Sequence, residues 1–213
     1  TIFHNDNCGG YHAGFSLPNA TGKNKKIDAV LFTHPHKDHI AGLDDIRAFN
    51  YFQQSSINIY ANILTQEALK REFTYVFAEK KYPGIPQINL CTIDMDPFII
   101  GDITIIPILV WHLHMPVLAF RFGNFTYVTD ANKIEEEERK KITGSKIMVL
   151  NALRKEKHIS HFNLPQAIEM VQQLKVPEAY FIHLSHQMGK HMDVEKSLPA
   201  GIHLAYDGLK IMC

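Results

Sequence analysis

A dense group of metal-ligand side chains follows an apolar run near the start of the chain. The apolar run covers residues 27–32, and residues 33–39 then read THPHKDH. Neutral imidazole and carboxylate groups are ligands that borderline divalent ions such as Zn²⁺ prefer. The apolar run predicts a buried strand, and the apolar spacing after Gly42 predicts a helix. The sequence therefore predicts a tight loop at a strand end, with His34 and His36 directed at one metal and Asp38 and His39 at a second.

A simpler interpretation of this loop is a polar connection in which Asp38 caps the following helix. Three imidazoles and one carboxylate within six residues exceed what capping needs, and polar side chains of these types are seldom gathered without a reason. We therefore interpret the segment as a metal-binding loop.

Length and composition favour one globular domain. The chain has 213 residues, enough to bury a sizeable core, and 46% hydrophobic with 21% charged residues is ordinary for such a domain. Lysine plus arginine equals aspartate plus glutamate, so the formal net charge is zero. This balance argues against a general affinity for nucleic acid, which usually requires a basic excess, although a local basic patch stays open.

Cysteine usage and hydropathy predict a soluble, cytoplasmic protein. The three cysteines, Cys8, Cys91 and Cys213, are odd in number and far apart, so they form no disulfide framework. There is no apolar run of 18 residues and no signal-peptide pattern at the start. Residues 1–26 show no clear period and predict irregular chain, in which His4, His12 and Cys8 are interpreted as solvated groups.

The rest of the chain alternates predicted strands and helices without repeats or linkers, so we expect a single domain over residues 1–213. Strands are predicted at residues 57–61, 88–93, 103–110, 117–122, 125–129, 146–151, 178–184, 202–206 and 209–212. Helices are predicted at residues 62–78, 134–142, 165–174 and 189–197. The Gly123-Asn124 pair predicts a hairpin turn.

Three later strand ends carry further ligand types. His112 and His114 follow the strand at 103–110, Asp130 terminates the strand at 125–129, and His183 lies where the strand at 178–184 ends. A histidine at a strand end is more often a structural group than a ligand. A two-metal site, however, needs more ligands than the first loop offers, and these three places supply them.

The motifs resemble those of the metallo-β-lactamase superfamily, closest to the branch with the cyclic phosphodiesterase of phosphonate breakdown. The resemblance is carried by THPHKDHIAGLDD, WHLHMPVLAFRFGNFTYVTDA, NALRKEKHISHFNLPQA, FIHLSHQMGKH and LAYDGLKI. It implies an α/β fold, an αββα sandwich of two mixed β-sheets with outer helices.

The resemblance also implies a ligand set. His34, His36, His112 and Asp130 would hold one divalent ion, and Asp38, His39, Asp130 and His183 the other, with zinc or manganese as the metals. His112 is preferred to His114 because its spacing to the following strand matches the family. His161 falls where the family keeps an active-site histidine that is no ligand, and we expect it, with Asp38, to be catalytic.

The start of the chain departs from the family. Members usually begin with a strand, a Gly-Thr-Gly loop and a cysteine cluster, and residues 1–26 show none of these. The N-terminal strands are therefore expected to be missing, and a structural-zinc role for His186 is left open.

The expected function is hydrolysis of a small cyclic or nucleotide-like phosphodiester by hydroxide held between two metals. Alternatives are a tRNA 3′-end endonuclease, a thioester or lactam hydrolase, and, from another class, a metal-binding scaffold without turnover. The redox branch of the superfamily is disfavoured because it has glutamate where His36 stands. The expected partner is a small substrate, with no membrane; nucleic acid is disfavoured, and a homodimer stays open.

Overall fold

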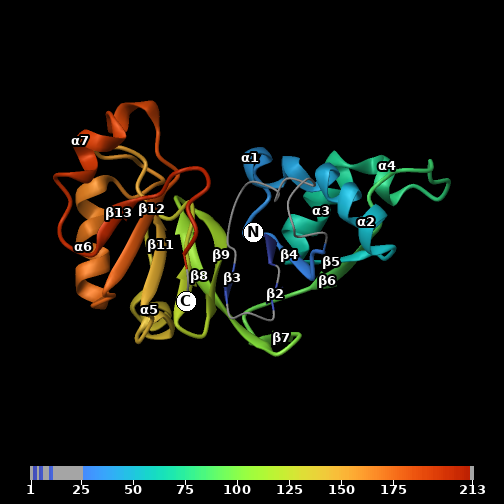
Figure 1. Cartoon of the computed structure of the whole chain (residues 1–213), viewed down its shortest axis with the longest axis horizontal. Helices are drawn as coiled ribbons and strands as arrows, with labels where there is room; N and C mark the ends of the chain where they lie inside the picture. Colours follow the sequence, from blue (N-terminus) through green and yellow to red (C-terminus); the bar gives the residue numbers. More distant parts are fainter. Residues whose placement is uncertain (1, 4, 7–9, 12–25, 212–213) are drawn as a thin grey trace. The chain divides into compact units, whose positions relative to one another are not determined.

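The computed structural model describes residues 2–3, 5–6, 10–11 and 26–211, and these form two compact units. One unit comprises the described residues up to Asp94 together with residues 210–211, and the other comprises residues 95–209. Each unit has its own sheet (Figure 1). Each also has its own hydrophobic core. The prediction of a single domain stays a prediction.

The first unit is built on a four-stranded sheet in the order β1-β4-β5-β6. Its strands are β1 (Ile2–Phe3), β4 (Ala29–Leu31), β5 (Ile57–Ala61) and β6 (Ile88–Thr92). Strands β4, β5 and β6 are parallel, and β1 is antiparallel to β4, so the sheet is mixed. Two further short strands, β2 (Asn5–Asp6) and β3 (Gly10–Tyr11), pair with each other.

The helices of this unit bury their apolar residues together with one side of β5. They are α1 (Lys37–Ile40), the 3₁₀ helix η1 (Ala41–Ile46), α2 (Arg47–Gln53), α3 (Ile63–Glu72) and α4 (Thr74–Phe77). Burial alternates along β5, and its buried Ile57 and Ile59 join Phe49 and Leu69 of the helices in one core. The Asn62 side chain caps α3 by accepting from the Thr65 N–H at 2.9 Å.

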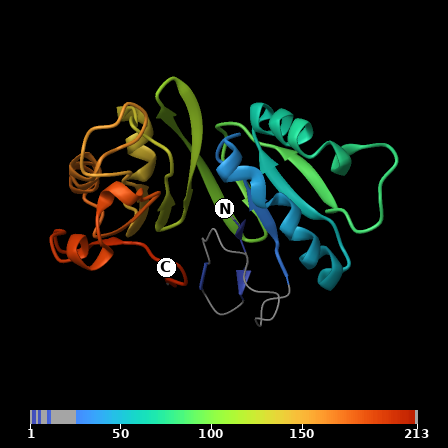
Figure 2. The same ribbon diagram turned by 90° about the horizontal axis from the view of Figure 1, so that it is seen from above.

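The second unit contains a seven-stranded sheet in the order β13-β12-β11-β10-β9-β8-β7. Its strands are β7 (Phe98–Ile100), β8 (Ile103–His112), β9 (Met115–Phe122), β10 (Phe125–Tyr127), β11 (Ile147–Asn151), β12 (Glu178–Ile182) and β13 (Ile202–Leu204). Strands β7 to β10 pair antiparallel, and β10 to β13 pair parallel. Strands β8 and β9 form a long hairpin (Figure 2).

The helices of the second unit accompany this sheet. They are α5 (Glu136–Ile142), α6 (Leu164–Leu174), η2 (His186–Met188) and α7 (His191–Glu195), with α6 and α7 beside the parallel strands (Figure 1). Asn163 and Gln166 form a capping box at the start of α6, where Pro165 occupies the first turn. The buried face of α6 packs into the same core as Phe181 and Leu150 of the sheet.

Strand direction in the second unit gathers several side chains at one edge of the sheet. Two antiparallel steps separate β8 from β10, so β8 runs in the same direction as β10, β11 and β12. Their carboxyl ends therefore meet at one edge, where polar groups of a site commonly collect. The residues at or just beyond these ends are His112, Asp130, Asn151 and His183.

The predicted α/β class, with two mixed sheets and accompanying helices, is confirmed. The predicted hairpin turn is also observed, with Gly123 at φ 55° between β9 and β10. Two expectations were wrong: strands β1, β2 and β3 occur within residues 1–26, and residues 209–211 form no strand. Strand β7 was not predicted.

The expectations for His4, Cys8, His12 and Cys213 lie outside the described residues. Among the described helices, none is both long and apolar enough to cross a membrane.

Candidate metal centre

The histidine loop, residues 33–39, follows strand β4, and its last three residues form the start of helix α1. Its His34 side chain is fully buried, and the Nδ1 atom of His34 lies 2.9 Å from Thr33 Oγ1. The His34 ring centroid lies 4.8 Å from that of His36 and 4.2 Å from that of His39. The rings of His36 and His39 therefore lie beside the buried His34 ring; the assignment of these residues to two metals stays a prediction.

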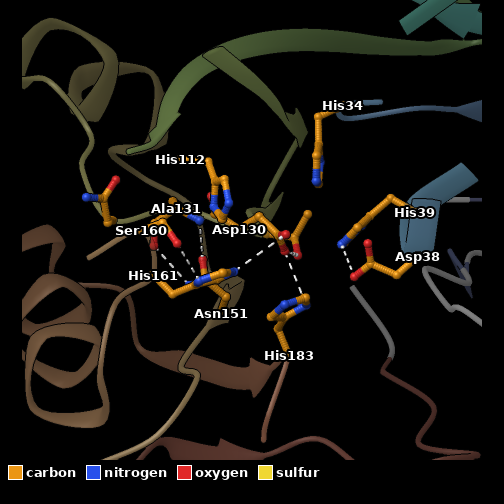
Figure 3. Close-up of polar contacts among 12 residues, drawn as sticks. His34, Asp38, His39, His112, Asp130, Ala131, Asn151, Ser160, His161 and His183 are labelled. Atoms are coloured by element: carbon orange, nitrogen blue, oxygen red, sulfur yellow. Dashed lines mark hydrogen bonds and ion pairs between the residues drawn. The ribbon is translucent and has the colours of Figure 1, made fainter. Parts of the chain in front are cut away.

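Asp38 and His39 lie in the first turn of α1 rather than in the loop proper. Asp38 Oδ2 lies 3.3 Å from His39 Nε2 (Figure 3). The N-cap residue of α1 is His36, whose side chain makes no capping bond. Lys37 is turned away from these ligand types, because its Nζ binds Glu72 Oε2 at 2.8 Å and lies over the Phe73 ring. The cation of the motif is thus paired with the carboxylate at the end of α3.

Asp130 is the centre of the second unit's polar cluster. Its side chain is 2% exposed, and Oδ1 accepts a hydrogen bond from Thr129 Oγ1 at 2.7 Å. His183 Nδ1 lies 3.2 Å from Oδ1, and His161 Nε2 lies 3.6 Å from Oδ2 (Figure 3). A buried carboxylate is costly unless positive charge or hydrogen bonds compensate it, and a divalent cation beside imidazoles would supply that charge.

The backbone of Asp130 is held in an unusual conformation. Its φ is 52°, and that of His183 is 57°, in the left-handed region that non-glycine residues seldom adopt. Such conformations cost about 1–3 kcal/mol each and persist where surrounding contacts enforce them. His183 directly follows β12, and Asp130 lies three residues beyond the end of β10; at this edge His183 Nδ1 and Asp130 Oδ1 lie 3.2 Å apart.

The side chain of Asn151 enforces the conformation after Asp130. Asn151 ends β11 and is fully buried; its Oδ1 accepts from the Ala131 N–H at 2.7 Å, and its Nδ2 donates to the Ala131 carbonyl at 2.9 Å. The Phe162 N–H donates to the same carbonyl at 2.7 Å. Ala131 is thereby clamped on both sides of its α-carbon, which fixes the direction of the Asp130 side chain (Figure 3).

Replacing Asn151 with leucine should disturb both stability and activity. The change keeps a similar volume but leaves a buried N–H without its acceptor, so we expect the free energy of unfolding to fall by about 3 kcal/mol, measured by urea denaturation. The matched change Gln173→Leu removes an exposed amide on α6 and should alter stability by less than about 0.5 kcal/mol. Equal effects of the two changes would show that the clamp contributes nothing.

His112 is the last residue of β8, and its Nδ1 lies 3.1 Å from the Asp130 backbone carbonyl. Because a carbonyl only accepts, Nδ1 carries the proton and Nε2 carries the lone pair, the form in which histidine binds a metal. His114 lies instead in the exposed hairpin turn. His112, Asp130 and His161 each place a possible ligand atom within 4.8 Å of the others, a set able to hold a metal ion.

The sequence interpretation missed two groups in this cluster. One is Asn151, whose position at the end of an apolar strand is the same signal that pointed to Asp130. The other is the pair His158 and Ser160, both in contact with the His161 Nδ1 atom. The predicted site residues of the first unit are His34, His36, Asp38 and His39, and those of the second unit are His112, Asp130, His161 and His183. His186 is exposed, and its structural-zinc role stays open.

The sequence matches the family described as "Beta-lactamase superfamily domain" over residues 11–184, most of the chain. An octanoyltransferase of Porphyromonas gingivalis (strain ATCC BAA-308 / W83) is 36% identical over 186 residues, which cover 86% of this chain and 37% of that protein. The chain therefore spans well under half the length of this relative.

Solved structures show the same fold. A diphosphatase from the PhnP family is 34% identical, with a TM-score of 0.80, and the match covers 88% of this chain and 72% of that chain. The metallo-beta-lactamase fold protein YhfI from Bacillus subtilis is 19% identical, with a TM-score of 0.68 over 86% of this chain and 76% of that chain. Human tRNase Z, short form, is 14% identical, with a TM-score of 0.66 over 90% and 81%. These matches confirm the fold predicted from the motifs.

Proposed function

This chain belongs to the beta-lactamase superfamily, and we propose that it is a metal-dependent hydrolase that acts on small phosphodiesters. The substrate would be cyclic or nucleotide-like, and two divalent ions, zinc or manganese, would be required. The observation that carries the proposal is the buried Asp130 carboxylate among histidines held at strand ends, a donor set suited to such ions.

The ligand assignment follows the donor types within each unit and the family's motif order. We assign one ion to His34, His36, His112 and Asp130, and the other to Asp38, His39, Asp130 and His183. When bound, divalent ions polarise phosphoryl oxygens and lower the pKa of water. Asp130 would contribute its carboxylate to holding both ions, and the Asn151 clamp on Ala131 would limit movement of the backbone next to it.

Two side chains would move protons. Asp38 is an exposed carboxylate beside His39, suited to accept the proton of the attacking water. The buried His161 directs its Nε2 atom toward Asp130, where it would protonate the leaving alkoxide. Proton transfer by these groups needs no change of redox state, in keeping with hydrolysis.

A second candidate substrate is a diphosphate. The structure at 34% identity is described as a diphosphatase, and its chemistry also cleaves a bond to a phosphoryl group. tRNA cleavage is less favoured, because likeness to the human tRNase Z at 14% identity reflects fold alone and this chain has zero formal net charge. A small substrate as partner and a cytoplasmic location stay proposals, as does a homodimer.

Chelation should abolish turnover. We expect EDTA treatment to lower the hydrolysis of bis-(p-nitrophenyl) phosphate by roughly a hundredfold or more, because the ions carry the Lewis-acid chemistry, and Mn²⁺ or Zn²⁺ should restore it. The rate of hydrolysis would also be measured for a 2′,3′-cyclic nucleotide, a dinucleoside diphosphate and a precursor tRNA. Faster turnover of the diphosphate would favour the second candidate. No metal-dependent turnover of any of the four would refute the proposal.

A further inference from the structure

The Nδ1 side of His161 is enclosed by two groups that the proposed mechanism does not use. Ser160 Oγ lies 3.1 Å from His161 Nδ1, and His158 Nδ1 lies 3.2 Å from it. His158 Nδ1 also lies 3.3 Å from Ser160 Oγ, so the three polar groups form a closed triangle. This arrangement fixes the ring of His161 from the side opposite to Asp130.

One contact in this triangle decides which atoms carry protons. The Ser160 backbone N–H points at His158 Nδ1, with 3.4 Å between the two nitrogens. A backbone N–H can only donate, so His158 Nδ1 presents its lone pair. Two facing nitrogens that both lack a proton would repel each other; His161 Nδ1 therefore carries a proton and donates it to His158.

The protonation of His158 agrees with this arrangement. Burial, followed by the charges of His161 and Arg154, lowers the pKa of His158 below its ordinary value. His158 is accordingly a neutral acceptor at neutral pH. Arg154 is itself held by Gln187 Oε1 at 2.7 Å and by the Lys157 carbonyl at 3.0 Å, which keeps its positive charge close to this loop.

The other nitrogen of His161 has a different environment. Among the described residues, Nε2 of His161 makes no hydrogen bond, and its charged neighbour is the Asp130 carboxylate at 3.6 Å. The ring is also fixed sideways, because it stacks on His183 with 4.9 Å between centroids and 12° between planes. Its Nε2 atom is therefore the single nitrogen available for proton exchange with a substrate.

We propose that His158, assisted by Ser160, is a positioning residue that keeps a proton on His161 Nδ1 and so makes Nε2 the reactive nitrogen. The proposal rests on the general-acid role assigned to His161 in the proposed function. To act as a general acid, His161 must carry a proton on Nε2 in addition to the one on Nδ1. The Nε2 proton passes to the leaving alkoxide, which becomes an alcohol, and His161 returns to the neutral form with its Nδ1 proton still bonded to His158. No imidazolate forms, and the protons balance.

Two variants separate positioning from packing. His158→Phe keeps a ring but removes the acceptor, whereas His158→Asn places a carbonyl acceptor near the position of Nδ1. General acid catalysis matters most for poor leaving groups, so His158→Phe should lower kcat about 10- to 100-fold for an alkyl phosphodiester. For a p-nitrophenyl ester the loss should be under about threefold, with KM unchanged for both. His158→Asn should recover most of the difference, and the exposed His114→Phe should change neither.

The second measurement does not depend on turnover. Long-range ¹H–¹⁵N correlation spectra of the metal-free protein, recorded where the imidazoles are neutral, report which ring nitrogen carries the proton. The His161 signals are assigned by their absence in His161→Gln. We expect the proton on Nδ1 in the wild type and in His158→Asn, and a shift toward Nε2 in His158→Phe.

A proton on Nε2 in the neutral wild type would overturn the proposal, even if His158→Phe failed to fold. So would a folded His158→Phe with the same spectrum and the same leaving-group dependence as the wild type. If the wild type hydrolyses neither ester, the proposed function fails, and the spectra still decide the role of His158.

Discussion

Asp130→Asn should lower kcat/KM for the preferred phosphodiester by about a thousandfold or more and release bound metal. The amide has nearly the shape of the carboxylate, and asparagine tolerates the left-handed conformation at φ 52°. The change therefore removes charge with little disturbance of the backbone. A neutral amide is a weak ligand that cannot compensate a divalent ion, so both the affinity and the chemistry that depends on it should fall.

Thermal unfolding separates this effect from damage to the fold. Ligands that bind only the folded protein stabilise it by mass action, so Mn²⁺ or Zn²⁺ should raise the wild-type Tm. In Asp130→Asn that rise should largely disappear, while the Tm in EDTA should equal or exceed the wild-type value, because an uncompensated buried carboxylate has been removed. The matched change Asp193→Asn, at an exposed carboxylate on α7, should leave activity and metal response intact.

Metal content by atomic spectroscopy completes the test. Wild-type stoichiometry and a metal-dependent Tm in Asp130→Asn would contradict the assignment of Asp130 as a ligand to either ion. Loss of activity alone would then point to a role in orienting substrate rather than in holding metal.

The predicted strand ends explain why much of the site could be read from the sequence. An apolar run that ends in a polar residue predicts a polar group at the edge of a sheet. In the second unit, His112, Asp130 and His183 do lie at one edge of the seven-stranded sheet. The histidine loop likewise needs only local spacing to gather its rings. Their role as ligands stays a proposal, since position alone does not establish binding.

Other parts of the site depend on contacts between distant segments. The Asn151 amide acts on Ala131, twenty positions away, and no local pattern reveals that pairing. The positive φ of Asp130 is likewise a feature of the folded chain that no local pattern reveals. The sequence around His158 matches no motif, so the sequence does not point to a role for it. The proposed role follows from the Ser160 backbone N–H, which is directed at His158 Nδ1 in the folded loop.

Fold prediction failed where elements are short. Strand β7 has three residues, and β1, β2 and β3 have two each, so none shows a period that a hydrophobic pattern could reveal. Residues 209–211 read as a strand from composition, but the described chain there bends after Gly208, at φ 88°, and pairs with no neighbour in a sheet.

His161→Ala should keep the full metal content while lowering kcat by about 10²- to 10⁴-fold, the usual contribution of a positioned acid or base. We expect the rate to fall because the Nδ1 atom of His161 is bonded within its own loop, which leaves Nε2 directed at Asp130. We expect the metal to be kept because Nε2 lies 3.6 Å from the Asp130 carboxylate, whereas His183 Nδ1 lies 3.2 Å from it. A ligand and a proton donor both require a nitrogen near Asp130, so distance alone does not distinguish them.

Metal content and rate, measured together, do distinguish them. Loss of one equivalent of metal in His161→Ala, with a smaller rise in Tm on adding Mn²⁺, would make His161 a ligand and displace it from the role of acid. Retained metal with a lost rate would place it beside the ions as the proton donor. His161→Gln is the matched variant, because it fills the same buried space with a neutral group. A rate as low as that of His161→Ala would show that proton transfer, rather than packing of the ring against His183, is what the site loses.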